Sequence, residues 1–291
     1  MRLPSFLRLP GPLPSRDGIS AETVAARHGH VLAEARGGGT PGEPVPIQVS
    51  FVVPAHNEEA YLPATLAGIL AEIERAGCTA ELVVVDNAST DRTATVAAAV
   101  PGVRVVSEPQ KGLSAARQAG FVASSGRLVA NVDADTLLPE GWLTRVLDSF
   151  ARDPKLVALS GPYIYYDVSP TVRRMARVFY LVGFGTYSFN RFVLRVGSML
   201  QGGNFVVTRA ALERIGGYDP AFTFYGEDTD VARRLHRIGH VRFTLDLPAY
   251  SSGRRLAGEG VFMVGWRYSV NYLWATFVGK PFTRSSVDFR P

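Results

Sequence analysis

The stretch "RLVANVDADTLLPEGW" (residues 127–142) combines three signals that decide the fold. The apolar run at 128–130 indicates a buried strand, and Pro139 favours the start of a helix. Between them, Asp133 and Asp135 are two residues apart, so on an extended segment both carboxylates point to the same side. A bound cation would make this repulsion tolerable, but a solvated turn with Asp135 as the helix cap explains the spacing as well.

Three other segments resemble this strand and give the fold class. All four runs are short, β-branched and continuously apolar, as expected for strands that are covered on both faces. Helical segments are expected between and after them, at about 58–76, 91–99, 112–124 and 139–151. The alternation predicts an α/β domain with a mostly parallel sheet and helices on both faces. The strands are expected in "VSFVVPA" (49–55), "AELVVVD" (80–86), "VRVVSE" (103–108) and "RLVANVD" (127–133).

Polar residues follow three of these strands, at the edge where such sheets bind ligands. They are Asn57 and Glu58, Asp86, and the pair Asp133 and Asp135. A helix cap explains any single set. Three sets at one edge favour a nucleotide site.

Composition limits the class of protein. The chain has 291 residues, 46% of them hydrophobic, and a net charge of +5, which suits acidic partners. The single cysteine excludes an internal disulfide. Basic residues are spread through the first half without a recognition motif, so we expect no nucleic-acid partner. The sequence lacks an eighteen-residue uncharged apolar run and a continuous signal-peptide core, so we expect a cytoplasmic protein.

The second half carries two further patterns. "GGNFVVTRAALERIGGYDP" (202–220) predicts a turn, a short strand and a helix that ends at Gly216 and Gly217. "YGEDTDVARRLHRIGH" (225–240) predicts a helix with Glu227, Asp228 and Asp230 in its first turn. The helix dipole alone favours acidic residues there, so a structural role is also open.

Taken in order, six segments resemble the family 2 glycosyltransferases, the inverting nucleotide-sugar enzymes of the GT-A fold. The resemblance extends over about residues 48–240 and implies a Rossmann-like GT-A domain. The six segments are "VSFVVPAHNEEAYLPATL", "LVVVDNASTDRTATVA", "KGLSAARQAGFVASSG", "NVDADTLLPEGWL", "GGNFVVTRAALERIGGYDP" and "GEDTDVARRLHRIG".

The resemblance implies a donor site for a nucleotide-diphosphate sugar. The D-x-D aspartates correspond to Asp133, at the ribose or base, and Asp135, the direct ligand of a metal that Asp133 also helps to hold. Hard oxygen ligands suit Mg²⁺ or Mn²⁺, which neutralises the departing diphosphate. The other residues that correspond to the nucleotide pocket are Pro54, Ala55, Asn57, Glu58, Asp86, Lys111, Gly112 and Arg117.

The resemblance also implies the catalytic groups. Inversion needs a general base for the acceptor hydroxyl, and the family's E-D motif corresponds to Glu227 and Asp228. We expect Asp228 to be the base and Glu227 to orient it or the acceptor. Gly202, Gly203 and Asn204 are expected close to the donor sugar or the acceptor.

One position departs from the family. Many relatives place a metal-binding histidine after the strand that follows the E-D helix, but here "LPAYSSGRRLAGEG" (247–260) carries Arg254 and Arg255. Arginine binds phosphate oxygens in a bidentate manner, so we expect both to hold the diphosphate beside the metal or partly in its place. A solvated basic loop is the alternative.

Two aromatic and basic segments, 171–200 and 261–282, suggest where the acceptor binds. Such segments can lie in a membrane interface with arginines toward phosphate. They can equally cover the acceptor cleft or form a dimer contact. We expect a hydroxyl acceptor that is a glycan, a small molecule or a lipid carrier of cell-envelope polysaccharide. Peripheral contact with the anionic inner face of the cell membrane stays one alternative beside the cleft and the dimer contact.

The expected organisation is a flexible N-terminal tail (1–46), a GT-A domain (47–250) and a basic, aromatic helical extension (251–291). Within the domain, the donor half covers about 47–155 and the acceptor half about 156–250. A catalytically impaired sugar-nucleotide-binding relative stays open because of the missing histidine. A nucleotidyltransferase usually has a glycine-rich loop after its first strand, which "PAHNEEAYL" (54–62) lacks.

Overall fold

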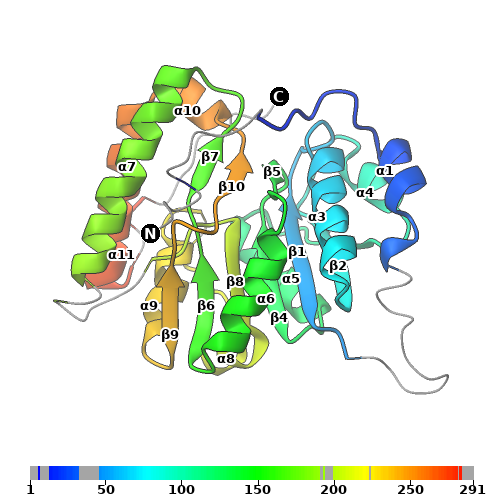
Figure 1. Cartoon of the computed structure of the whole chain (residues 1–291). Helices are drawn as coiled ribbons and strands as arrows, with labels where there is room; N and C mark the ends of the chain where they lie inside the picture. The colour runs from blue at the N-terminus through cyan, green and yellow to red at the C-terminus, as the bar shows by residue number, and fades with distance from the viewer. Residues whose placement is uncertain are drawn as a thin grey trace.

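A seven-stranded sheet forms the centre of the computed structural model, which describes residue 6 and residues 13–32, 46–190, 193, 199–222, 224–280 and 282–283. The strand order is β3-β2-β1-β4-β8-β6-β9, and β8 runs antiparallel to both neighbours while the other pairs are parallel. Figure 1 shows the helices packed in front of and behind this sheet. The strands are β1 (Val49–Ala55), β2 (Ala80–Asp86), β3 (Arg104–Ser107), β4 (Leu128–Val132), β6 (Leu156–Ser160), β8 (Asn204–Thr208) and β9 (His240–Phe243).

The expected mostly parallel sheet with helices on both faces is confirmed. Alternate residues of β1 point to opposite faces: Phe51 and Val53 enter one core, and Val52 enters the other. Because both faces are buried, the first strands carry no polar alternation. The helices are α1 (Ala21–His28), α3 (Leu62–Ala76), α4 (Thr93–Ala98), α5 (Leu113–Ala123), α6 (Trp142–Arg152), α7 (Pro170–Phe189), α8 (Arg209–Arg214), α9 (Glu227–His236), α10 (Arg254–Glu259) and α11 (Val261–Val278).

A second, small sheet lies above the carboxyl ends of the large one (Figure 1). It joins β5 (Thr136–Leu137), β10 (Ala249–Ser251) and β7 (Tyr163–Tyr165) in that order. β5 directly follows the two aspartates, and β10 ends three residues before Arg254. The small sheet therefore brings the start of the expected C-terminal extension next to the loop after β4.

Helix α6 begins at Trp142, three residues after Pro139. Gly141 has a φ of 75°, a left-handed conformation that cannot continue into the helix. The helix cap comes from α3: the carboxylate of Glu72 accepts hydrogen bonds from the backbone N–H groups of Gly141 and Leu143, both at 3.0 Å. Asp135 is therefore not the cap.

The described part of the N-terminal segment is packed, unlike the flexible tail that we expected. Ser20 caps α1, which lies on α3. Val24, Val31 and Leu32 are buried in the main core. Their apolar side chains stabilise this packing. Residues 33–45 of the expected tail lie outside the described residues.

In the described part of the chain, no helix combines the length and apolarity needed to span a bilayer.

Candidate active site

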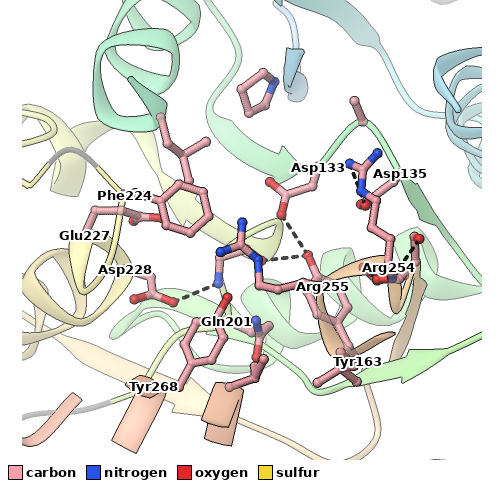
Figure 2. A pocket seen from close by; sticks show the side chains of 18 of the residues that line it. Asp133, Asp135, Tyr163, Gln201, Phe224, Glu227, Asp228, Arg254, Arg255 and Tyr268 are labelled. Atoms are coloured by element: carbon pink, nitrogen blue, oxygen red, sulfur yellow. Dashed lines mark hydrogen bonds and ion pairs between the residues drawn. The ribbon is translucent and has the colours of Figure 1, made fainter. Parts of the chain in front are cut away.

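A pocket opens at the carboxyl ends of β1 and β4, below the small sheet (Figure 2). It contains about 1100 Å³ of empty space. Its walls come from the end of β1, the loop after β4, the first turn of α9 and the start of α10. The structure brings ten of the expected residues into its lining: Pro54, Glu58, Arg117, Asp133, Asp135, Gly202, Glu227, Asp228, Arg254 and Arg255.

Arg117 binds one carboxylate of each acidic motif, Asp133 in the loop after β4 and Glu227 in α9. It projects from α5 and is fully buried. Its Nη2 donates to Asp133 Oδ1 at 3.0 Å, and its Nη1 donates to Glu227. Burial opposes the charge, but Glu227 and Asp133 outweigh it and raise the pKa of Arg117. The side chain is therefore a permanent, buried cation between the loop after β4 and α9.

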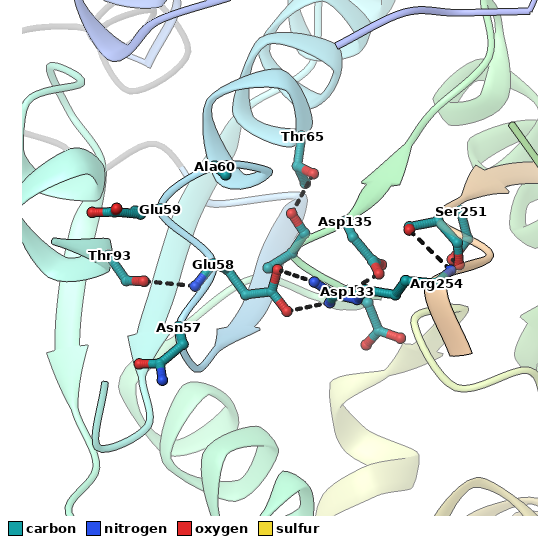
Figure 3. Close-up of polar contacts among 12 residues, drawn as sticks. Asn57, Glu58, Glu59, Ala60, Thr65, Thr93, Asp133, Asp135, Ser251 and Arg254 are labelled. Atoms are coloured by element: carbon teal, nitrogen blue, oxygen red, sulfur yellow. Dashed lines mark hydrogen bonds and ion pairs between the residues drawn. The ribbon is translucent and has the colours of Figure 1, made fainter. Parts of the chain in front are cut away.

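Asp135 has a separate cationic partner. The Arg254 guanidinium lies 3.1 Å from Asp135 Oδ2 and also binds both carboxylate oxygens of the buried Glu58 (Figure 3). The Arg254 guanidinium also lies 4.7 Å from the centre of the Tyr61 ring. Burial again opposes the charge, and Asp135 and Glu58 raise the pKa of Arg254. The repulsion within the aspartate pair is thus relieved by two different arginines.

The carboxylates of the pocket can be compared with the ligands that a divalent cation requires. No group of three or more Asp, Glu, His or Cys side chains suited to a metal occurs among the residues that the structure describes. Asp135 and Glu58 nevertheless share one cation, the Arg254 guanidinium, so their oxygens converge. Mg²⁺ usually binds one or two carboxylates together with substrate phosphates and water. This pair fits such an ion if Arg254 moves aside.

Asp228 lies at the mouth of the pocket, in the first turn of α9. Its Oδ2 accepts from the Gly202 N–H at 3.0 Å, and its Oδ1 accepts from the Thr229 N–H at 2.7 Å. Burial raises the pKa of Asp228, while these hydrogen bonds and Arg117 oppose the rise. Figure 2 shows this carboxylate among the side chains that line the pocket, near Tyr268. The group is therefore fixed in position and faces the pocket.

Glu227, the neighbouring acid, is held differently. Burial raises its pKa to about 8, and Asp228 and Asp133 add to the rise although Arg117 opposes it. Its Oε1 binds Arg117, while its buried Oε2 has no hydrogen-bond partner among the described residues. Glu227 therefore contacts the loop after β4 only indirectly, through Arg117, which also binds Asp133.

Two expected sugar-site residues serve the protein itself. The Asn204 side chain is fully buried away from the pocket, where it accepts from Trp142 Nε1 and donates to the carbonyl oxygens of Gly161 and Leu247. These contacts occupy its side chain, and Asn204 is not part of the pocket lining. At Gly203, whose φ is +74°, a Cβ would lie 2.1 Å from Asp133 Cγ. Glycine there lets Asp133 approach the backbone.

Five expected nucleotide residues lie outside the pocket lining, in neighbouring loops. Asn57 Oδ1 accepts from the Thr90 N–H at 2.8 Å, and the Gly112 N–H donates to Asn87 Oδ1 at 2.8 Å. Asp86 pairs in register with Ala55 at the ends of β2 and β1. Its Oδ1 is buried and has no hydrogen-bond partner among the described residues. The five residues are Ala55, Asn57, Asp86, Lys111 and Gly112.

The structure adds pocket residues that the sequence analysis missed. The Tyr163 hydroxyl donates to the Gly202 carbonyl oxygen at 2.6 Å and lies 3.3 Å from Asp133 Oδ2. Arg255 lies 4.5 Å from the centre of the Phe224 ring and donates to the Tyr225 hydroxyl at 2.8 Å. Tyr163 and Phe224 line the pocket but stand outside recognisable motifs, and nothing in the local sequence distinguishes them from core aromatics. Their roles depend on contacts between distant segments.

Two family models match the chain. The model described as "Glycosyl transferase family 2" matches residues 50–216, and the model described as "N-terminal domain of galactosyltransferase" matches residues 191–259. The first covers more than half of the chain, including β1 and the aspartate pair.

Curated relatives agree with these models. A glycosyltransferase of Mycobacterium tuberculosis is 43% identical over 109 residues, which are 38% of this chain and 46% of the relative. An undecaprenyl-phosphate 4-deoxy-4-formamido-L-arabinose transferase of Aeromonas hydrophila is 34% identical over 132 residues, 43% of this chain and 37% of the relative. The matched regions thus span less than half the length of these relatives.

The fold has solved counterparts. A mannosyltransferase from Pyrobaculum calidifontis in complex with GDP-Man and Mn²⁺ aligns with a TM-score of 0.58 and 20% identity, covering 89% of this chain and 72% of the other. At this identity the likeness concerns the fold alone, and it confirms the expected GT-A class.

Proposed function

The chain belongs to glycosyl transferase family 2, and from this premise we propose that it transfers a sugar from a nucleotide-diphosphate donor to a hydroxyl acceptor, with inversion at the anomeric carbon. The observation that carries the proposal is the position of Asp228. Its carboxylate, fixed by two backbone N–H groups, lines the same pocket as Asp133 and Asp135. A base and a diphosphate site therefore share one cavity.

In the proposed reaction, the acceptor oxygen attacks the anomeric carbon and its proton passes to Asp228. The bond from the anomeric carbon to the diphosphate breaks, and the diphosphate leaves with the electron pair. Attack from the face opposite the leaving group inverts the configuration. Asp228 suits this role because burial raises its pKa, which makes its carboxylate a stronger base than an exposed one.

Glu227 has a positioning role in this proposal. Its Oε1 already binds Arg117, and Arg117 also binds Asp133. The other oxygen, Oε2, is buried, so neither oxygen of Glu227 is presented to an acceptor hydroxyl. Glu227 would therefore hold Arg117, and with it the donor loop, in place relative to Asp228.

Asp135 and Glu58 are the residues that would hold Mg²⁺ or Mn²⁺, with the remaining ligands from the diphosphate and water. Bound there, the ion would neutralise charge that develops on the leaving diphosphate. Arg254 and Arg255 line the same pocket and would bind phosphate oxygens. Asp86 Oδ1, a buried acceptor without a hydrogen-bond partner in the described part of the chain, would accept from the nucleoside.

Two finer hypotheses concern the acceptor: that it is lipid-linked, and that the protein contacts an anionic membrane. They are supported by the exposed aromatic side chains of α7 and α11 and by the arginines that lie among them. The printed name of the Aeromonas relative, an undecaprenyl-phosphate transferase, agrees with a lipid-linked acceptor.

The test of the base compares Asp228→Asn with Asp148→Asn, an exposed carboxylate on α6. Turnover of a nucleotide sugar should fall by about 100-fold or more in Asp228→Asn, because the base is lost. Calorimetric binding of the same nucleotide should stay within about threefold, since the isosteric amide keeps the shape of the site. Asp148→Asn should match the wild type in both. Unchanged turnover in Asp228→Asn would remove the role from this residue.

A further inference from the structure

A second cavity, with predominantly apolar walls, lies between α7 and α11. The two helices contact each other and lie side by side in Figure 1, on the side of the molecule opposite α1 and α3. Ala176, Phe179 and Val182 line the groove from α7, and Val261, Val264 and Leu273 line it from α11. Neither the base nor the donor site explains a groove of this composition.

One end of the groove is polar and joins the donor pocket. Asp228, Gln201 and Tyr268 line both cavities. Gln201 accepts a hydrogen bond from the Tyr180 hydroxyl at 2.8 Å, so its side chain is fixed at this junction. A molecule in the groove would therefore place a polar group at Asp228 and an apolar part between the helices.

Helices α7 and α11 and the residues next to them carry most of the large exposed hydrophobic side chains. Among the described residues sixteen such side chains are exposed, and all but Val122 lie within 178–282. Isolated exposed apolar residues are ordinary, but their concentration on two helices that contact each other favours an interaction site. The set comprises Val178, Phe179, Leu181, Val182, Phe189, Val193, Phe262, Met263, Trp266, Tyr268, Leu273, Trp274, Phe277, Val278 and Phe282.

Charge around the groove indicates which apolar partner it fits. Residues 170–190 and 260–280 include Arg173, Arg174, Arg177, Arg267 and Lys280 and no acidic residue. Such a surface attracts an anionic lipid headgroup layer while its aromatic side chains enter the interface. Arg267 is paired with Glu259, which lies just before α11. The other four basic residues have no acidic neighbour within these two ranges, so a second copy of the chain on this face would bring like charges together.

We propose that the groove between α7 and α11 binds the apolar chain of a lipid acceptor, whose hydroxyl headgroup reaches Asp228 at the polar end. This inference rests on the proposed function and adds to it the groove in which the apolar chain of the acceptor binds. The apolar chain enters from the exposed face of the two helices, so the lipid is glycosylated without leaving the membrane surface completely. The donor would then lie on one side of the residues that line both cavities, and the apolar chain of the acceptor on the other. Seven residues line both cavities: Tyr165, Gln201, Gly226, Asp228, Leu256, Val264 and Tyr268.

The probes for this site are alkyl β-D-glucosides with hexyl, heptyl and octyl chains, titrated as monomers into the full chain. Each has a hydroxyl headgroup and a single apolar chain. Affinity should rise about two- to fourfold for each added CH₂, because each CH₂ leaves water for the groove. An affinity that does not depend on chain length would overturn the proposal.

Two glycines of α7 provide a blocking variant with a matched control. A Cβ at either Gly183 or Gly185 would meet no atom within 4 Å, so both positions accept a side chain without a clash at Cβ. Only Gly183 lines the groove. Gly183→Phe should weaken octyl glucoside binding at least about tenfold by filling the groove. Gly185→Phe should stay within about twofold of the wild type.

Equal affinities of the two variants would overturn the proposal, as would a stable dimer in light scattering that dissociates when octyl glucoside is added, since a second copy would then cover the groove. Binding of UDP and GDP, measured in the same variants, distinguishes a failure of the proposed function from a failure of the groove assignment. If neither nucleotide binds the wild type, the proposed function fails. If a nucleotide binds and the glucosides do not, the groove assignment alone fails.

Discussion

At the scale of single residues, the site depends on how its carboxylates are compensated. Asp133 and Asp135 do not share one counter-ion: Arg117 binds the first and Arg254 the second. Each arginine also binds one glutamate, Glu227 or Glu58. Removing charges from water is costly unless they are paired, so these two triads allow a dense acidic pocket to form without a ligand. They leave Asp228 held mainly by backbone N–H groups.

The position of Asp228 predicts the pH dependence of transfer. Burial raises its pKa above the ordinary aspartate value of about 3.9. A base must be ionised, so turnover should be low in acid and should rise as pH rises through this elevated pKa. The measurement is kcat against pH, with nucleotide binding followed at each pH as a control for folding. A rate that stays constant down to about pH 4 would contradict the assignment, because an elevated pKa requires the loss to begin above the usual value.

At the scale of elements, the sequence predicted those helices and strands whose signals are local. The four continuous apolar runs became β1 to β4 within one residue of their expected ends, and Gly216 and Gly217 end the region of α8 in left-handed conformations. The start of α6 could not be predicted in the same way. Its cap, Glu72, is about seventy residues earlier in the chain and reaches Gly141 only after α3 and α6 pack together.

This cap predicts an effect of substitution on stability. Glu72→Ala removes the acceptors for the N–H groups of Gly141 and Leu143, so it should lower the free energy of unfolding by about 1–3 kcal/mol. Glu74→Ala on the same helix is the matched control, because Glu74 is half exposed and pairs only with histidines among the described residues. Urea denaturation measures both. A Glu72→Ala midpoint equal to that of Glu74→Ala would show that the cap contributes nothing.

At the scale of the whole molecule, the pocket unites segments from residue 54 to residue 268. Sequence motifs identified its charged members, since acids and arginines at fixed spacings are recognisable in a linear chain. They did not identify Tyr163, Gln201 or Tyr268, which reach the site from β7 of the small sheet, from the loop before β8 and from α11. Asn204 shows the opposite case. It belongs to a recognisable motif, but its side chain makes its hydrogen bonds inside the protein, with Trp142 and Gly161.

The apolar and basic face of α7 and α11 predicts binding to anionic vesicles. Co-sedimentation with phosphatidylglycerol vesicles should be strong at about 0.1 M salt and weaker at about 1 M, because the Debye length falls from about 10 Å to about 3 Å. Trp266→Ser should reduce binding, whereas Val122→Ser, a similarly exposed apolar residue on α5, should not. Binding that ignores lipid charge and salt, or that Val122→Ser reduces equally, would count against this face as the contact.

The central claim is that the pocket around Asp133 and Asp135 binds the diphosphate of a sugar nucleotide. Titration calorimetry of UDP and GDP with Mn²⁺ tests it most directly, on the wild type and on Asp135→Ala. We predict that the wild type binds at least one of the two nucleotides and that Asp135→Ala weakens this binding about tenfold or more, because the diphosphate loses the carboxylate that orders its cation and Arg254. Undiminished binding by Asp135→Ala, or no binding of either nucleotide by the wild type, would contradict the account.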